Sequence, residues 1–137
     1  MLDSSLQPQL SDFGFHLLLR PVAAQAMLEA LTIDGYKSPE LIEIRDASRE
    51  TDIYSLGIIL LELLTRKEAT SCRLLVLNQK MSDVFTTDLI SEKKDLGSNI
   101  EVVLRRFYQL AMACCSPSPA LRPDIKQVIR KLEEIVY

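Results

Sequence analysis

The sequence predicts a mainly α-helical fold arranged around one buried helix. Residues 52–65 are apolar on nearly every side, which is typical of a helix covered by protein all round. Two later segments, 100–114 and 123–136, carry apolar residues every three or four positions, the spacing of one helix face. A chain of 137 residues, 47% of them hydrophobic, can bury one core of this kind.

The elements before the central helix are short. Residues 1–11 alternate apolar residues with turn formers and predict a short extended segment. Residues 23–31 are good helix formers and predict one or two helical turns. Ser38, Pro39 and Glu40 then predict a helix start, with serine as the cap, proline at the first position and glutamate at the positive end of the dipole.

The remaining elements follow the same reasoning. A polar loop is expected over 45–51, and a short helix around 74–77. Cys114 lies on the apolar face of 100–114 and is predicted to belong to the core. The last helix should bury a single apolar face made of Ile125, Val128, Ile129, Leu132 and Ile135.

Composition excludes several classes of function. A net charge of -3, with scattered basic residues, gives no basic patch for nucleic acid. Three cysteines and one histidine argue against a disulfide framework and a zinc site, and favour reduced thiols in the cytoplasm. No apolar run reaches the ~18 residues of a membrane span, so no membrane segment is expected in this chain.

Four short motifs occur in a fixed order. They are Asp12-Phe13-Gly14, Gly35-Tyr36-Lys37-Ser38-Pro39-Glu40, Asp52-Ile53-Tyr54-Ser55-Leu56-Gly57 and Leu121-Arg122-Pro123-Asp124. Each is weak alone, but together they resemble the second half of a protein kinase domain. Residues 52–65 and 116–128 are similar to plant receptor-like kinases, and most similar to the transmembrane kinase-like, leucine-rich-repeat receptor pseudokinase type.

The resemblance implies a truncated kinase C-lobe, with an activation segment over 12–40 and a helical subdomain over 41–137. The N-lobe and the catalytic loop of the family would precede this region, so both are expected to be absent from the chain. Proteins of this type have a leucine-rich-repeat ectodomain, one membrane span and a cytosolic kinase-like domain. The implied location is cytoplasmic, at the cytosolic face of the plasma membrane if the chain is part of a receptor.

The resemblance also assigns residue roles. In the family, Asp12 would bind the magnesium ions that bridge the ATP phosphates, and Gly14 would let the backbone turn. A chance tripeptide in a turn is the alternative. Glu40, which follows Pro39, would pair with Arg122 in a structural contact; two unrelated surface charges are the alternative. Asp52 would hold the catalytic loop in the family, and in this chain would cap the central helix.

Two functional hypotheses remain open, since no catalytic residue and no cofactor are expected here although the parent family uses Mg-ATP. The chain is either a non-catalytic, binding fragment of a receptor-like pseudokinase, or part of an active Ser/Thr kinase whose N-terminal half is missing. A pseudogene product without a role is a weaker third reading. Residues 17–31 favour packing over regulated phosphorylation, because they are strongly apolar.

A partner is expected on the central helix. The helices that should pack on residues 53–64 from the N-terminal side are not in the sequence, and each large apolar side chain left exposed forfeits ~1.5–3 kcal/mol. We therefore expect the chain to aggregate by itself, or to be covered by a protein partner or by the missing N-terminal half.

Overall fold

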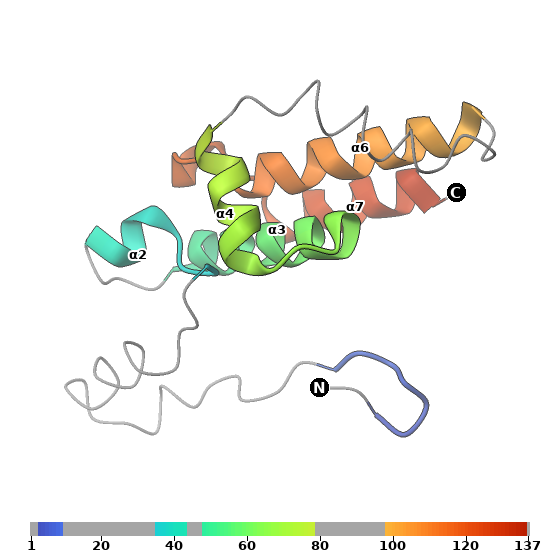
Figure 1. Ribbon diagram of the computed structural model, residues 1–137, viewed down its shortest axis with the longest axis horizontal. Helices are drawn as coiled ribbons and strands as arrows, with labels where there is room; N and C mark the ends of the chain where they lie inside the picture. Colours follow the sequence, from blue (N-terminus) through green and yellow to red (C-terminus); the bar gives the residue numbers. More distant parts are fainter. Residues whose placement is uncertain (1–2, 10–34, 44–47, 79–97, 137) are drawn as a thin grey trace. The chain divides into compact units, whose positions relative to one another are not determined.

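The computed structural model describes residues 3–9, 35–43, 48–78 and 98–136, and the chain divides into two units, Met1–Thr32 and Ile33–Tyr137 (Figure 1). In the first unit, residues 3–9 form a closed turn. The Asp3 amide donates to the Gln7 carbonyl at 3.0 Å, and the Asp3 carboxylate accepts from the amides of Ser5 and Gln7 at 2.8 and 2.9 Å. The predicted extended segment therefore turns back on itself here, because Asp3 satisfies the backbone donors that follow it.

The second unit is a helical bundle, which confirms the mainly α prediction. Its central helix, α3, packs against α4 and α6, and α6 packs against α7 (Figure 1). The elements of this unit are α2 (Pro39–Glu43), α3 (Arg49–Thr65), α4 (Ala69–Asn78), α6 (Ser98–Cys114), the 3₁₀ helix η2 (Pro119–Leu121) and α7 (Ile125–Val136).

The prediction that Asp52 caps the central helix is wrong. The helix begins at Arg49, and Ser48 is its cap: the Thr51 amide donates to Ser48 Oγ at 3.3 Å, and the Ser48 amide donates to Thr51 Oγ1 at 3.1 Å. This reciprocal pair satisfies two free donors at the helix start and outcompetes the later aspartate. Asp52 instead lies in the first turn, where its negative charge favours the helix dipole.

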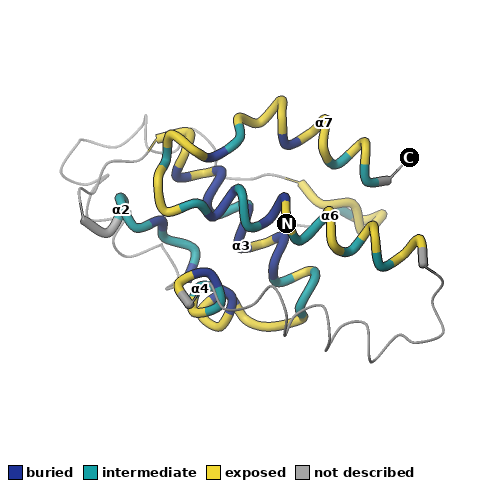
Figure 2. Tube along the Cα trace, turned by 90° about the horizontal axis from the view of Figure 1, so that it is seen from above, coloured by how far each residue is buried: buried dark blue, intermediate teal, exposed yellow. Residues whose placement is uncertain are grey.

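The core lies where α3 meets α4 and α6 (Figure 2). Gly57 allows the closest approach, because a Cβ atom at this position would lie 2.6 Å from Cys115 Sγ and 2.8 Å from Cys114 Cβ. Cys114 is fully buried, as predicted. The largest fully buried apolar side chains of the core are those of Tyr54, Ile58, Leu61 and Val128.

The central helix is not covered on every side, contrary to the prediction. Its described neighbours bury the side that carries Ile58 and Leu61, whereas Ile59 is 43% exposed and Leu63 is 70% exposed. The prediction for the last helix is also wrong in part, since Ile125 is 52% exposed and Ile129 is 50% exposed. In both helices, apolar side chains extend beyond the area that the described neighbouring helices cover.

The other helices occur where the sequence predicted them, but their first and last residues differ from the prediction. The predicted short helix at 74–77 extends over the whole of α4, and α6 begins two residues before the predicted start at residue 100. The last helix begins at Ile125 rather than at residue 123, because Asp124 and Gln127 exchange hydrogen bonds of 2.8 and 2.9 Å and form its cap. Among the residues described here, none of the helices has the length and apolar character needed to cross a membrane.

Candidate functional site

Three parts of the chain, two of them distant in sequence, meet at the side chain of Arg122. Its guanidinium donates to both carboxylate oxygens of Glu40, at 2.5 and 2.8 Å, so that the two charged groups pair fork to fork. It also donates to the carbonyl of Glu50 at 2.8 Å and to the carbonyl of Ser116 at 2.9 Å. The contact between Glu40 and Arg122 that the sequence predicted is therefore present, across 82 positions of the chain. We call these four residues the Arg122 junction.

The charged pair at the centre of the Arg122 junction is largely shielded from water. The Arg122 side chain is 1% exposed and the Glu40 side chain is 17% exposed. The hydrogen bonds from Arg122 hold the pKa of Glu40 at about 2, well below its ordinary value of 4.5, although burial acts in the opposite direction. The guanidinium carbon also lies 5.1 Å from the centre of the Tyr54 ring, within range of a cation–π contact.

Residues just before α2 are fastened to the side of α3. Tyr36 Oη donates to Glu62 Oε2 at 2.6 Å, and Ser55 Oγ donates to the Tyr36 carbonyl at 3.0 Å. The bond to Glu62, together with burial, raises the pKa of Tyr36 to about 12. Sequence reasoning missed both contacts. Their signal is that Ser55 and Glu62 are polar interruptions of an apolar helix and lie two turns apart, on one side of it.

Gly35 brings this segment close to the start of α4. Its backbone has a φ of 120°, a conformation that residues with a Cβ rarely adopt, and a Cβ there would lie 2.8 Å from the Thr70 amide nitrogen. Pro39 is the first residue of α2, as predicted. Ser38 stands at the predicted cap position, directly before α2, but its buried hydroxyl accepts no hydrogen bond from the first helical turn, so the predicted cap bond is not formed. The hydroxyl instead acts on the Glu40 carboxylate, whose pKa it helps to lower. Residues 35–43 are thus held through Gly35, Tyr36 and Glu40.

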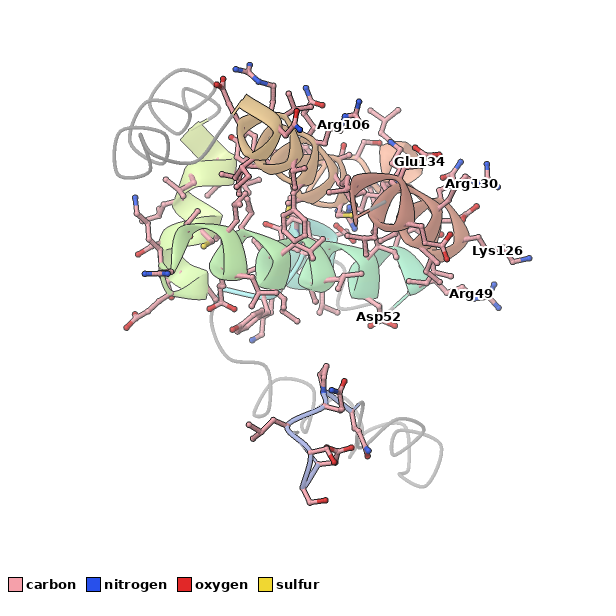
Figure 3. The ribbon with its side chains drawn as sticks, turned by 90° about the vertical axis from the view of Figure 1, so that its right-hand side faces the viewer. Arg49, Asp52, Arg106, Lys126, Arg130 and Glu134 are labelled. Carbon is pink, nitrogen blue, oxygen red and sulfur yellow. The ribbon has the colours of Figure 1, made fainter. Side chains whose placement is uncertain are left out.

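Of the three remaining predicted site residues, the structure describes only Asp52. Asp12 and Gly14, to which the resemblance assigns a magnesium ligand and a backbone turn, lie outside the described residues. The side chain of Asp52 points away from the neighbouring helices (Figure 3). Within the described ranges, no group of three or more histidine, cysteine, aspartate or glutamate side chains could hold a metal ion.

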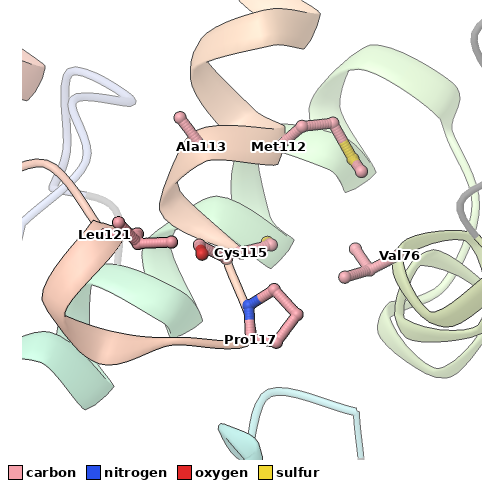
Figure 4. Close-up of a pocket in the computed structure, with 7 residues that line it drawn as sticks. Val76, Met112, Ala113, Cys115, Pro117 and Leu121 are labelled. Carbon is pink, nitrogen blue, oxygen red and sulfur yellow. The ribbon is translucent and has the colours of Figure 1, made fainter.

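A pocket of about 470 Å³ opens between α4, the end of α6 and the segment before α7 (Figure 4). Burial raises the pKa of the Cys115 thiol to about 12, so the thiol is not a nucleophile at neutral pH. The pocket therefore offers an apolar contact surface rather than chemistry. Its lining residues are Val76, Met112, Ala113, Cys115, Ser116, Pro117 and Leu121.

Comparison with known proteins gives one consistent family. The protein kinase domain family matches residues 1–132. The chain is 30% identical to the probable leucine-rich repeat receptor-like protein kinase IMK3 of Arabidopsis thaliana, over 98% of this chain and 18% of that protein. It is 28% identical to the putative kinase-like protein TMKL1 and 31% identical to the probable inactive receptor kinase At3g08680, both of Arabidopsis thaliana, in each case over 98% of this chain and 22% of the relative.

The chain thus spans about a fifth of the length of these relatives. The match lies within their kinase domains, and its helical architecture is that of a kinase C-lobe. The buried pair between Glu40 and Arg122 joins two of the motifs that carried the resemblance. The chain therefore belongs to the protein kinase domain family, and its relatives are plant receptor-like kinases.

Proposed function

We propose that this chain is the C-lobe part of a receptor-like pseudokinase and acts by binding rather than by phosphoryl transfer. The observation that carries the proposal is the Arg122 junction, which fastens residues 35–43 to α3 through a buried, fully paired charge. A group with this geometry positions a segment of the backbone. It has no free nucleophile or base, because its carboxylate is committed to arginine.

The proposed division of the chain follows from this anchor. Residues 12–40 would be the activation segment, ending at the junction, and residues 41–137 would be the helical subdomain that holds it. The names of two relatives, putative kinase-like protein TMKL1 and probable inactive receptor kinase At3g08680, support a pseudokinase of the transmembrane kinase-like type. As part of such a receptor, the chain would lie at the cytosolic face of the plasma membrane.

The proposed partner surface is the uncovered side of α3. Ile59 and Leu63 are one turn apart on this helix and both are exposed. Exposed apolar side chains on the central helix of a bundle favour cover by a further protein surface. We propose that the N-terminal half of a kinase domain, or another protein, covers them.

An active Ser/Thr kinase is the second candidate. It is favoured by the intact Asp12-Phe13-Gly14, whose aspartate would serve as a magnesium ligand in Mg-ATP binding. The names of other relatives, such as the probable leucine-rich repeat receptor-like protein kinase IMK3, are consistent with this candidate.

Nucleotide binding, measured on this chain and on the native protein that contains it, separates the two candidates. Thermal unfolding of the wild-type chain and of Asp12→Ala should be followed with and without Mg-ATP, beside an active kinase domain as positive control. We expect no ligand-dependent rise in the unfolding temperature of either variant. A saturable rise in the wild type that is lost in Asp12→Ala would overturn the pseudokinase proposal, because bound nucleotide stabilises only the state that binds it.

The intact mass of the native protein tests the same question in the cell. The native protein that contains peptides of this chain should be isolated, its intact mass should be measured, and the Mg-ATP measurement should be repeated on it. A heavier species that binds Mg-ATP and phosphorylates a generic protein substrate would establish the enzyme candidate. A native protein of any mass that neither binds Mg-ATP nor phosphorylates the substrate would support the binding role.

A further inference from the structure

We propose that Ser118 is a phosphorylation site, modified by a separate protein kinase that requires a proline directly after its acceptor serine. The inference goes beyond the proposed function and holds whether or not this chain binds nucleotide, because another enzyme carries out the reaction. It rests on the serine–proline dipeptides of the chain, which the structure places in three different surroundings. They are Ser38-Pro39, Ser116-Pro117 and Ser118-Pro119.

The first dipeptide is closed to such a kinase. The Ser38 side chain is 0% exposed, and the residue lies directly before α2, in the segment that Glu40 fastens to Arg122. Its hydroxyl can meet the nucleotide of another enzyme only after this segment has left α3. That opening breaks the buried charged pair, so it is rare in the folded chain.

The second dipeptide is held by its backbone. Ser116 is partly buried and belongs to the Arg122 junction, since its carbonyl accepts from Arg122 Nε at 2.9 Å. Its amide donates to the Ala113 carbonyl at 3.3 Å, at the end of α6. To enter a kinase active site, Ser116 has to release a buried, charged donor, which costs more than releasing a neutral one.

The third dipeptide has an accessible acceptor. Ser118 is exposed, its φ of -87° and ψ of 119° are extended, and its hydroxyl forms no cap bond to η2. Pro117 and Ala120 beside it are exposed as well. The Ser118 carbonyl accepts from the Leu121 amide at 3.1 Å, but this neutral bond belongs to a single 3₁₀ turn, which opens at low cost. Of the three serines, only Ser118 thus offers a free hydroxyl on an extended, exposed backbone.

The reaction is an ordinary phosphoryl transfer to a hydroxyl. Ser118 Oγ attacks the γ-phosphorus of Mg-ATP bound by the other kinase, and the new oxygen–phosphorus bond forms as the bond to the leaving ADP breaks. The hydroxyl proton passes to the base of that kinase. The product carries about two further negative charges between Pro117 and Leu121 of the chain, which both line the pocket beside α4. Charge at this place disfavours an apolar contact.

Phosphorylation of the folded chain by an added kinase tests the proposal. The chain, at a concentration low enough to stay in solution, should be incubated with Mg-ATP and a proline-directed Ser/Thr kinase, and fragment mass spectrometry should follow each dipeptide with time. We expect modification of Ser118 to be at least about tenfold faster than that of Ser116, because Ser116 first has to release a charged donor. Ser118→Ala and Pro119→Ala should each lose the main product, whereas Ser116→Ala and Pro117→Ala should keep it.

A synthetic peptide of residues 112–124 is the matched control, because it carries both neighbouring dipeptides without the fold. The kinase should modify Ser116 and Ser118 of this peptide at similar rates. Ser118→Ala should keep the circular dichroism spectrum of the wild type, since the side chain is exposed. Absence of phosphate at Ser118 of the folded chain would overturn the proposal. The same ratio of the two rates in the chain and in the peptide would also overturn it.

Discussion

The two ends of α6 are parts of one helix in opposite surroundings. Over 98–106 the helix lies open to solvent, with Val102 48% exposed and Val103 40% exposed. There, Arg105 pairs with Glu101 at 3.1 Å, and both side chains are about half exposed. At the other end, Ala111 and Cys114 are fully buried against α3, and the chain continues to Arg122.

The comparison shows how the surroundings decide what one interaction contributes. One arginine–glutamate pair lies in the exposed end of α6, and a second pair of the same chemistry lies at the Arg122 junction, beyond the buried end. The exposed pair is local and screened by water, and pairs of this kind stabilise by roughly 0.2–0.5 kcal/mol. The pair at the Arg122 junction is buried and joins distant segments, so losing one partner leaves a charge without water or counter-charge.

Arg122→Ala should have the largest effect. It leaves the Glu40 carboxylate and two backbone carbonyls without their donor in a shielded site, and we expect a loss of about 3–5 kcal/mol in the free energy of unfolding. Urea unfolding followed by circular dichroism measures it. Arg105→Ala is the matched control at the exposed end of α6. Equal losses in the two variants would contradict the difference between the two ends.

Acid should weaken the buried pair at the Arg122 junction selectively. The pKa of Glu40 is about 2 in the folded chain and close to 4.5 when the group is free, so the unfolded state binds more protons between these values. The stability that this carboxylate contributes is complete above pH 4.5 and is lost as the pH falls towards 2. The free energy of unfolding, measured at a series of acid pH values, should fall more steeply with decreasing pH in the wild type than in Glu40→Gln. Identical slopes would mean that Glu40 is not the titrating group.

Gly57→Ala should destabilise the contact between α3 and α6. Alanine favours an exposed helix by about 1 kcal/mol over glycine, but overpacking a core costs roughly 1–3 kcal/mol. Since the new methyl group would lie 2.6 Å from Cys115 Sγ, we expect a net loss of about 1–2 kcal/mol in urea unfolding. Adding Cys115→Ala should recover part of it. Leu63→Ala, on the exposed side of α3, serves as control, and a stabilised Gly57→Ala would refute the close contact.

Glu101→Gln should have the smallest effect. It removes the charge from the exposed pair at the start of α6, where salt and water already screen the interaction. We expect a change below about 0.5 kcal/mol in the free energy of unfolding, and a smaller one in high salt. A loss comparable with that of Arg122→Ala would show that this end of the helix is also buried against a neighbour.

Several features could be predicted from the sequence because their causes are local or carried by motifs. The apolar spacing of α6 and α7 located both helices, and the order of the motifs located the contact between Glu40 and Arg122. The cap of α3 was misplaced, although Ser48 and Thr51 carried the signal of a reciprocal cap. The bonds of Tyr36 to α3 could not be predicted, because they depend on which side of α3 receives the segment.

By itself, the sequence determined that the chain forms helices around α3, and its resemblance to kinases indicated that one arginine and one glutamate meet across the fold. Only the tertiary structure decided which apolar sides are covered. Ile58 and Ile59 are neighbours of the same residue type, yet Ile58 is 0% exposed and Ile59 is 43% exposed. The physical reason is that periodicity reports only that a side of a helix is apolar. Burial requires a neighbouring element on that side, and tertiary packing places that element.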